Sequence, residues 1–295
     1  MTRSVSFVIA MVSMLVVSGC GDGKNRVVVG SKQFTEQKVL GEMVCQLIEI
    51  NTDFRVDRRL GLQGTKVAFA AIREGDIDIY PEYTGTALIN ILERDYDRDM
   101  DRDQIYDLVK REWSEQWSLR WLDPLGFDNT YAYAMRDQHA AELDITKISE
   151  LEPHADAIQA GFCHEYTTRP EYKKFEDVYG FMFDNVTKLD PDLTYRALQE
   201  GQVDIIDAFS SDGRIQAYDF RVLRDDKELF PPYDAAFVIR QDLADRHPEI
   251  LEQLKKLSGK ISATEMRKMN YDVSENLKAP ATVAAAFLRR EGLIE

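Results

Sequence analysis

The sequence predicts an α/β protein of two lobes, in which mostly parallel sheets are covered by helices. The first observation is length, since 295 residues suffice for two domains of ordinary size. The second is the alternation of short strand patterns with amphipathic helix patterns along the chain. The third is a short sequence motif, here called the repeated phrase, that occurs at 74–86 and again at 200–213. Both copies run from Glu-Gly through a β-branched residue, Asp and Ile to an aromatic residue and hydroxyls. We interpret them as equivalent walls of one cleft between the lobes.

The composition fits an ordinary soluble globular protein, with 44% hydrophobic and 30% charged residues. A net charge of −15 argues against binding to nucleic acid, because the phosphate backbone attracts clustered Lys and Arg. No long Gly/Ser-rich or Pro-rich linker divides the chain. We therefore expect two closely joined lobes in a monomer.

The first 20 residues resemble a bacterial lipoprotein signal. Arg3 precedes a short apolar run at 7–17, and Val17-Ser18-Gly19-Cys20 follows. The resemblance implies that Cys20 is lipidated and becomes the N-terminus of an exported protein, anchored to a bacterial membrane and facing the periplasm or cell exterior. Residues 21–26 would form a tether. A plain secretory signal and an uncleaved anchor are the alternatives.

The remaining cysteines, Cys45 and Cys163, lie in a helix pattern and at the end of a strand pattern. An exported protein permits a disulfide, but a pair so far apart in sequence is weak evidence for one. We expect two separate buried thiols.

The elements of the first half follow from periodicity and capping signals. Thr35 is expected to cap a helix that reaches Ile48, and Gly75 to end the helix that starts at Thr65. Pro81 is expected to end the strand of the first phrase, because proline cannot donate to a ladder. Strands are predicted at 26–30, 54–60 and 77–80, and helices at 65–74, 87–93 and 104–117.

In the second half, 127–135 is predicted to cross into the second lobe and 230–233 to cross back. The lobes would then comprise 27–127 with 234–295, and 128–233. Strands are predicted at 157–163, 203–209, 221–223 and 236–240, and helices at 148–151, 170–179, 191–200, 244–257, 264–270 and 281–290.

Several residues are expected to be structural. Alternating acids and arginines at 94–102 are typical of a solvated surface. Trp113, Trp117 and Trp121 are expected to pack in the core and at the surface. Residues 210–212 are expected to cap a helix, and Gly85 and Gly213 to serve backbone turns.

No pattern for catalysis, metal or cofactor binding occurs. The sequence has no G-x-S-x-G, no H-E-x-x-H or C-x-x-C, and no P-loop or G-x-G-x-x-G. Four scattered histidines do not suggest ligands, and among 52 acids chance pairs are certain. The sequence therefore favours a binding protein over an enzyme, with no cofactor, no metal and no catalytic residue predicted.

Five motifs in order carry a resemblance to a known family. They are Val29-Gly30-Ser31-Lys32-Gln33-Phe34-Thr35-Glu36, Asp78 to Thr86, Asn129-Thr130-Tyr131-Ala132, Ala208 to Arg214, and Phe230-Pro231-Pro232-Tyr233. Together they look like the substrate-binding proteins of ABC importers for glycine betaine, choline and related osmoprotectants. The resemblance covers essentially the whole mature chain.

The resemblance implies a two-lobed periplasmic-binding-protein fold of type II, with two mixed sheets joined by a two-strand hinge. It implies capture of a quaternary ammonium for the permease and ATPase subunits. By motif position, an aromatic box would be formed by Tyr83, Tyr131, Phe209 and Tyr233. A trimethylammonium group has no N–H, so ring faces recognise it, at roughly 0.5–2 kcal/mol per ring. Lys32, Thr86, Asn129 and Arg169 would supply polar contacts, with Lys32 and Arg169 at the ligand's carboxylate.

Two positions depart from the family pattern. Asn129 stands where some members carry Asp, and Phe209 where many carry Tyr. Both remove charge or polarity from the box, and they could favour a bulkier, histidine-derived betaine such as ergothioneine. A sensor or accessory lipoprotein with the same fold is the alternative from another functional class.

Overall fold

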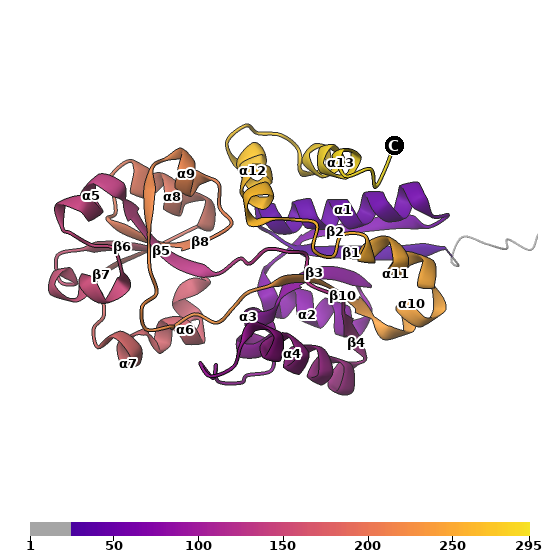
Figure 1. Cartoon of the computed structure of the whole chain (residues 1–295), viewed down its shortest axis with the longest axis horizontal. Helices are drawn as coiled ribbons and strands as arrows, with labels where there is room; N and C mark the ends of the chain where they lie inside the picture. Colours follow the sequence, from indigo (N-terminus) through magenta and orange to yellow (C-terminus); the bar gives the residue numbers. More distant parts are fainter. Residues whose placement is uncertain (1–24) are drawn as a thin grey trace, which may run out of the picture.

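The computed structural model describes residues 25–295, and the predicted signal with Cys20 lies outside the described residues. Two five-stranded mixed sheets form two lobes that lie side by side (Figure 1). This confirms the predicted α/β class. We call the lobe that contains both the first and the last described elements the first lobe.

The sheet of the first lobe has the strand order β2-β1-β3-β10-β4. Parallel pairing joins β1 to β2 and β3, and β10 runs antiparallel to β3 and β4. The strands are β1 (Arg26–Lys32), β2 (Arg55–Leu62), β3 (Ile79–Tyr83), β4 (Leu119–Trp121) and β10 (Ala235–Arg240).

Helices cover both faces of this sheet (Figure 1). The apolar face of α1 (Thr35–Asn51) is fully buried through Leu40, Met43 and Leu47. On the other face, α2 (Gly64–Glu74) and α4 (Arg102–Trp117) pack around Trp113, whose ring centroid lies 5.2 Å from that of Trp121. The remaining helices are α3 (Thr84–Thr86), η1 (Ala87–Ile91), α10 (Gln241–Arg246), α11 (Pro248–Lys255), α12 (Ala263–Ser274) and α13 (Pro280–Arg290).

The sheet of the second lobe has the strand order β7-β6-β8-β5-β9. Its strands are β5 (Tyr131–Arg136), β6 (Gln159–Cys163), β7 (Asn185–Leu189), β8 (Ile205–Phe209) and β9 (Phe220–Leu223). Its helices are α5 (Asp137–Glu142), η2 (Ile148–His154), η3 (Tyr166–Thr168), α6 (Pro170–Lys173), α7 (Phe175–Tyr179), α8 (Pro191–Gln199) and α9 (Arg214–Ala217).

Two segments run side by side between the lobes (Figure 1). The amide of Asn129 donates to the carbonyl of Tyr233 at 3.0 Å, and the amide of Ala235 donates to Phe127 at 3.2 Å. An isolated antiparallel bridge joins Asp128 to Asp234. The chain therefore passes into the second lobe and returns along one paired ribbon.

The prediction that Pro81 ends its strand is wrong. The amide of Thr84 donates to the carbonyl of Asp234, directly before β10, and the carbonyl of Asp78 accepts from the amide of Arg240. Residues of even number therefore make this ladder's hydrogen bonds. The nitrogen of Pro81 therefore points away from β10, towards the side where β1 pairs with β3 only at Ile79. No ladder bond is lost there, and the strand continues through the proline to Tyr83.

Other boundaries also differ from the prediction. Thr35 begins α1 without a side-chain capping bond, and the helix after Thr86 is a π-helix, η1. The helix predicted at 244–257 breaks at His247-Pro248, because proline cannot continue the α10 ladder, and the one predicted at 170–179 breaks at Lys174. Five short elements were not predicted: β4, β7, α3, α5 and η3.

The predictions for the helix end at Gly75 and for the cysteine and tryptophan side chains are confirmed. Gly75 ends α2 at φ +79°, and Cys45 and Cys163 are buried free thiols. Trp113 and Trp121 are buried, while Trp117 packs partly exposed against the same cluster.

Candidate functional site

A cavity of about 560 Å³ lies between the lobes. All eight cleft residues expected from the sequence line it, and so do Gln33, Phe34, Lys38, Thr65, Cys163, Glu165, Asp190 and Leu193. The structure therefore brings together the two kinds of side chain, aromatic and polar, that the motifs supply.

The aromatic wall is built at strand ends. Tyr83 ends β3 and Phe209 ends β8, while Tyr131 begins β5 directly opposite Phe209. Tyr233 lies two residues before β10, in the returning segment. Because these ends all face the gap between the two sheets, their rings meet there. The repeated phrase supplies Tyr83 and Phe209, which explains why it marks the cleft.

The ring of Tyr131 contacts two of the other three rings. The centroid of Tyr131 lies 4.7 Å from that of Phe209 and 5.8 Å from that of Tyr233. Phe34, which the sequence analysis did not assign to the site, stacks between Tyr83 at 6.3 Å and Phe209 at 6.1 Å. Phe34 thus joins a ring of the first lobe to a ring of the second.

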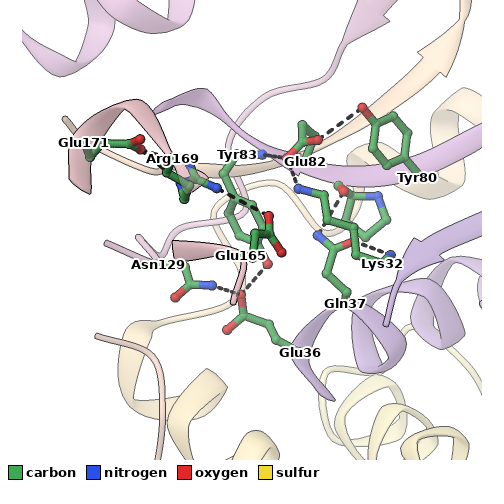
Figure 2. Close-up of polar contacts among 11 residues, drawn as sticks. Lys32, Glu36, Gln37, Tyr80, Glu82, Tyr83, Asn129, Glu165, Arg169 and Glu171 are labelled. Atoms are coloured by element: carbon green, nitrogen blue, oxygen red, sulfur yellow. Dashed lines mark hydrogen bonds and ion pairs between the residues drawn. The ribbon is translucent and has the colours of Figure 1, made fainter. Parts of the chain in front are cut away.

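Lys32 lies at the end of β1 with its charge already paired. Its Nζ is 2.5 Å from Oε1 of Glu82, and both side chains are buried. Glu82 also accepts from the Tyr80 hydroxyl at 3.2 Å and from the Tyr83 amide at 2.9 Å (Figure 2). The ammonium is 5.2 Å from the centroid of the Tyr83 ring. The acid thus holds Lys32 at the edge of the aromatic wall.

Arg169, which precedes α6, lies over the rings of the second lobe. Its guanidinium is 4.8 Å from the centroid of Tyr131 and 5.9 Å from that of Tyr233. Glu171 pairs with it at 3.0 Å and Glu165 at 3.6 Å (Figure 2). Glu171 also accepts a hydrogen bond from the hydroxyl of Tyr233. These contacts use part of the five guanidinium donors and leave others for a ligand.

Asn129 belongs to a polar network that reaches beneath the aromatic wall. Its Nδ2 donates to Oε1 of Glu36 at 2.9 Å, and its Oδ1 accepts from the Ser211 hydroxyl at 2.9 Å. The hydroxyl of Tyr83 donates to the same Glu36 oxygen at 2.6 Å (Figure 2). Burial and the Glu36 carboxylate raise the pKa of Tyr83, so the phenol stays protonated and remains a donor.

Glu36 was missed by sequence reasoning, although it ends the first family motif. Its side chain is buried, and burial raises the pKa of Glu36 against the opposing effect of hydrogen bonds from Tyr83 and Asn270. A signal was present in the sequence. Glu36 lies on the same face of α1 as Leu40, Met43 and Leu47, so it is an acid on an apolar stripe.

The remaining expected residues have simpler roles. Thr86 is buried and lines the cavity from α3. Ser211 was expected to cap a helix from its position. Its hydroxyl instead donates a hydrogen bond to Oδ1 of Asn129. Gly85 serves close packing and not a turn. A Cβ on Gly85 would lie 2.8 Å from both the Pro232 carbonyl oxygen and Cε1 of Tyr233.

A wider hollow of about 1180 Å³ adjoins the cavity and shares Gln33, Thr65, Glu165, Arg169 and Asp190 with it. Residues 93–99 line this hollow. The charged run is largely exposed, as expected, but it also faces the second lobe. Asp95 pairs with Lys174, and Nε of Arg98 donates to the carbonyl of Glu228 at 3.1 Å.

Within residues 25–295, no group of three or more His, Cys, Asp or Glu side chains is arranged to hold a metal ion. Nor does any helix in this range combine the length and apolar character needed to cross a membrane.

Comparisons with known proteins agree with this arrangement. The family described as OpuAC, the substrate-binding domain of ABC-type glycine betaine transport systems, matches residues 25–290. The chain is 32% identical to the carnitine transport binding protein OpuCC of Listeria monocytogenes, over 98% of this chain and 96% of that protein. It is 34% identical to the ergothioneine transport permease/ergothioneine binding protein EgtU of Helicobacter pylori, over 90% of this chain and 48% of that protein.

A solved structure described as a glycine betaine/carnitine/choline ABC transporter is similar in fold. It superposes with a TM-score of 0.77 at 30% identity, covering 91% of this chain and all of the other. The predicted two-lobed binding-protein fold is therefore confirmed. The matched family consists of substrate-binding domains, which also confirms the expectation of a binding protein and not an enzyme.

Proposed function

The chain belongs to the family of substrate-binding domains of ABC-type glycine betaine transport systems, and we propose that it captures a quaternary-ammonium compound in the cavity between its lobes. The ligand's cation lies against Tyr83, Tyr131, Phe209 and Tyr233, and its carboxylate against Lys32 and Arg169. The protein then delivers the ligand to the permease and ATPase subunits of an importer.

One observation carries this proposal. Rings from both lobes and two cationic side chains line a single hollow. The ring faces attract a cation that cannot donate a hydrogen bond, and each ring contributes roughly 0.5–2 kcal/mol. The free donors of Arg169 suit a carboxylate, since a guanidinium can form two parallel bonds to one. A zwitterion with its two charges at opposite ends fits this arrangement.

The cavity supports a betaine with a longer body than glycine betaine. Its volume of about 560 Å³ lies within the range of about 300–1,000 Å³ found for sites of drug-sized ligands. The similar proteins are named for carnitine and ergothioneine, both bulkier than glycine betaine. We include both in the ligand class, with glycine betaine and choline.

Isothermal titration of the purified protein tests this function. Glycine betaine, choline, carnitine, proline betaine and ergothioneine are each titrated, with thermal unfolding as a second readout. At least one should bind with a measurable heat and raise the melting temperature. A screen with neither heat nor thermal shift for any of them would refute the proposal.

Membrane attachment is a separate part of the proposal. Cys20 receives the lipid, and residues 21–25 tether the lobes to the membrane surface. Expression of the full chain in a bacterium should give a membrane-bound form whose first residue is an acylated Cys20 by mass spectrometry. A Cys20→Ala protein should lack the acyl mass, and an unmodified N-terminus in the wild-type form would refute the anchor.

A further inference from the structure

Glu36 is a buried carboxylate surrounded by neutral donors. It is 2% exposed and accepts hydrogen bonds from Tyr83 at 2.6 Å, Asn129 at 2.9 Å and Asn270 at 3.0 Å. Across residues 25–295, no lysine, arginine or histidine forms an ion pair with it. The nearby Asp212 carboxylate acts on it repulsively. Neutral hydrogen bonds reduce the cost of burying a charge but do not balance it.

The other buried acids of the site differ in this respect. Glu82 pairs with Lys32, and Glu171 pairs with Arg169. Their charges are therefore compensated within the protein. Of these three carboxylates only Glu36 lacks such a partner in the described part of the chain, and it is the one whose donors are two cavity-lining residues, Tyr83 and Asn129.

We propose that Glu36 is the counter-charge of the ligand's ammonium group and acts through Tyr83 and Asn129, without touching the ligand. This inference rests on the proposed function. A carboxylate that accepts a hydrogen bond from the phenol of Tyr83 makes the Tyr83 ring more electron-rich, and so strengthens attraction at the ring face. Its own charge adds a direct attraction, because Coulomb interactions weaken little in a dry interior. Glu36 is a positioning and charge-compensating residue.

The arrangement also accounts for Asn129. The Glu36 carboxylate can only accept hydrogen bonds, so it requires a donor at position 129. The Nδ2 group of Asn129 is that donor. Two acids at 36 and 129 would repel each other at this distance. The protein therefore places its negative charge one layer behind the cavity wall, on α1, and an amide at the wall itself.

The test separates charge from shape by using probes of equal shape. Tert-butylacetate is the carbon isostere of glycine betaine, and 3,3-dimethylbutan-1-ol is that of choline. Each lacks only the positive charge. The affinity ratio of the charged ligand to its isostere, measured by titration calorimetry and competition, is the charge preference of the site.

Glu36→Gln keeps the side-chain size and removes the charge. We expect its charge preference to fall about tenfold or more relative to wild type, while the isostere binds nearly as before. Glu252→Gln is the matched control, because it removes the same unit of charge from an exposed position on α11. Its charge preference should equal that of wild type.

A charge-relocation variant provides the rescue. In Glu36→Gln with Asn129→Asp, acid and amide exchange places across the 2.9 Å hydrogen bond, so a donor still faces an acceptor. This double variant should recover most of the charge preference. Should Glu36→Gln fail to fold, the double variant carries the test alone, its preference retained if the inference holds and lost if it does not.

Other outcomes are equally informative. Equal losses of affinity for the charged ligand and its isostere in Glu36→Gln would overturn the inference and leave Glu36 as a support of the fold. Failure of the wild-type protein to bind any quaternary ammonium would instead refute the proposed function, and this inference with it. The two failures are distinguishable because the second is seen without any substitution.

Discussion

Tyr131 lies at the centre of the aromatic wall. Its ring contacts Phe209, Tyr166, Tyr233 and Phe230, with centroids 4.7–6.0 Å away. Truncation to alanine removes a ring face and loosens its neighbours. We expect Tyr131→Ala to weaken binding of a quaternary ammonium about three- to thirty-fold, measured by titration calorimetry. Tyr131→Phe keeps the ring and should bind nearly as wild type. Unchanged binding in the alanine variant would place the cation elsewhere.

Asp207 gives the fold a pH-dependent stability. It is buried, and burial raises its pKa from 3.8 to about 6, although it accepts a hydrogen bond from the Cys163 amide at 2.7 Å. An acid whose pKa is higher in the folded state binds more protons when folded. Its contribution to stability is therefore greatest below about pH 4 and is lost as the pH rises through about 6.

Asp207→Asn keeps the acceptor and removes the titration. The free energy of unfolding of the variant relative to wild type should rise between pH 4 and pH 7, by up to about 3 kcal/mol. Urea denaturation at several pH values measures this difference, and the paired measurement cancels the other carboxylates. Parallel stability curves would show that Asp207 does not titrate in this range.

At the scale of single residues, the motifs predicted which aromatic side chains line the cavity. Tyr83 and Phe209 end strands, Tyr131 begins one and Tyr233 precedes one, and the local sequence patterns mark those strand ends. The hydrogen-bond partners of a residue could not be predicted in the same way. Glu36 meets Asn129 across 93 positions and Asn270 across 234, so only the folded chain shows that it is the hub of a network.

The segment from β3 to η1 shows how an element can serve a site. The strand β3 continues through Pro81 because the proline nitrogen faces a side without a ladder partner. The chain then turns into α3 (Thr84–Thr86) and the π-helix η1 (Ala87–Ile91). π-Helical turns often occur at functional sites. The amide and hydroxyl of Thr84 bond to Asp234 and Pro232, so this turn is fixed to the returning segment that carries Tyr233.

Gly85 makes that attachment possible. A methyl group there would meet the Pro232 carbonyl and the Tyr233 ring at 2.8 Å, and backbone cannot move aside as a flexible side chain can. We expect Gly85→Ala to displace Tyr233, weaken ligand binding about tenfold and cost about 1–3 kcal/mol of stability. Calorimetric titration and thermal unfolding measure the two effects.

Gly259→Ala is the comparison for this variant. Gly259 has φ +67° and no atom within 4 Å of a built Cβ, and it lies outside the cavity lining. It should lose about 1 kcal/mol of stability from backbone strain alone, with ligand affinity unchanged. Equal affinities in the two alanine variants would show that Gly85 does not position the site.

The sequence predicted the two lobes but not every strand of their sheets. The crossing segments and the repeated phrase have clear patterns, and each leads to a buried strand. The edge strand β7 has no buried residue among Asn185–Leu189, so it offers no apolar alternation to detect. Only three residues form β4. Such strands exist because a neighbour supplies hydrogen bonds, and that information lies in the fold, not in the local sequence.

The relative position of the lobes depends on contacts made outside the paired ribbon. Asn270 of α12 donates to Glu36 in the first lobe and to the carbonyl of Ser211 in the second, each at 3.0 Å. Asp95 and Lys174 add an exposed ion pair, a type that contributes little. The buried contact at α12 is therefore the stronger determinant, and Gly213 lies beside it.

Gly213 packs directly on α12. A Cβ there would lie 2.4 Å from the Arg267 carbonyl oxygen and 2.7 Å from Cβ of Tyr271. Its φ of −68° suits alanine, so backbone strain contributes nothing and only the contact between the lobes is affected.

We expect Gly213→Ala to separate α12 from the second lobe and break the hydrogen bond from Asn270 to Ser211. Small-angle scattering should then show a larger radius of gyration at saturating ligand, with affinity reduced about tenfold or more. Because neither lobe loses core contacts, thermal stability without ligand should change little. Scattering and affinity equal to wild type would show that this contact does not hold the lobes together.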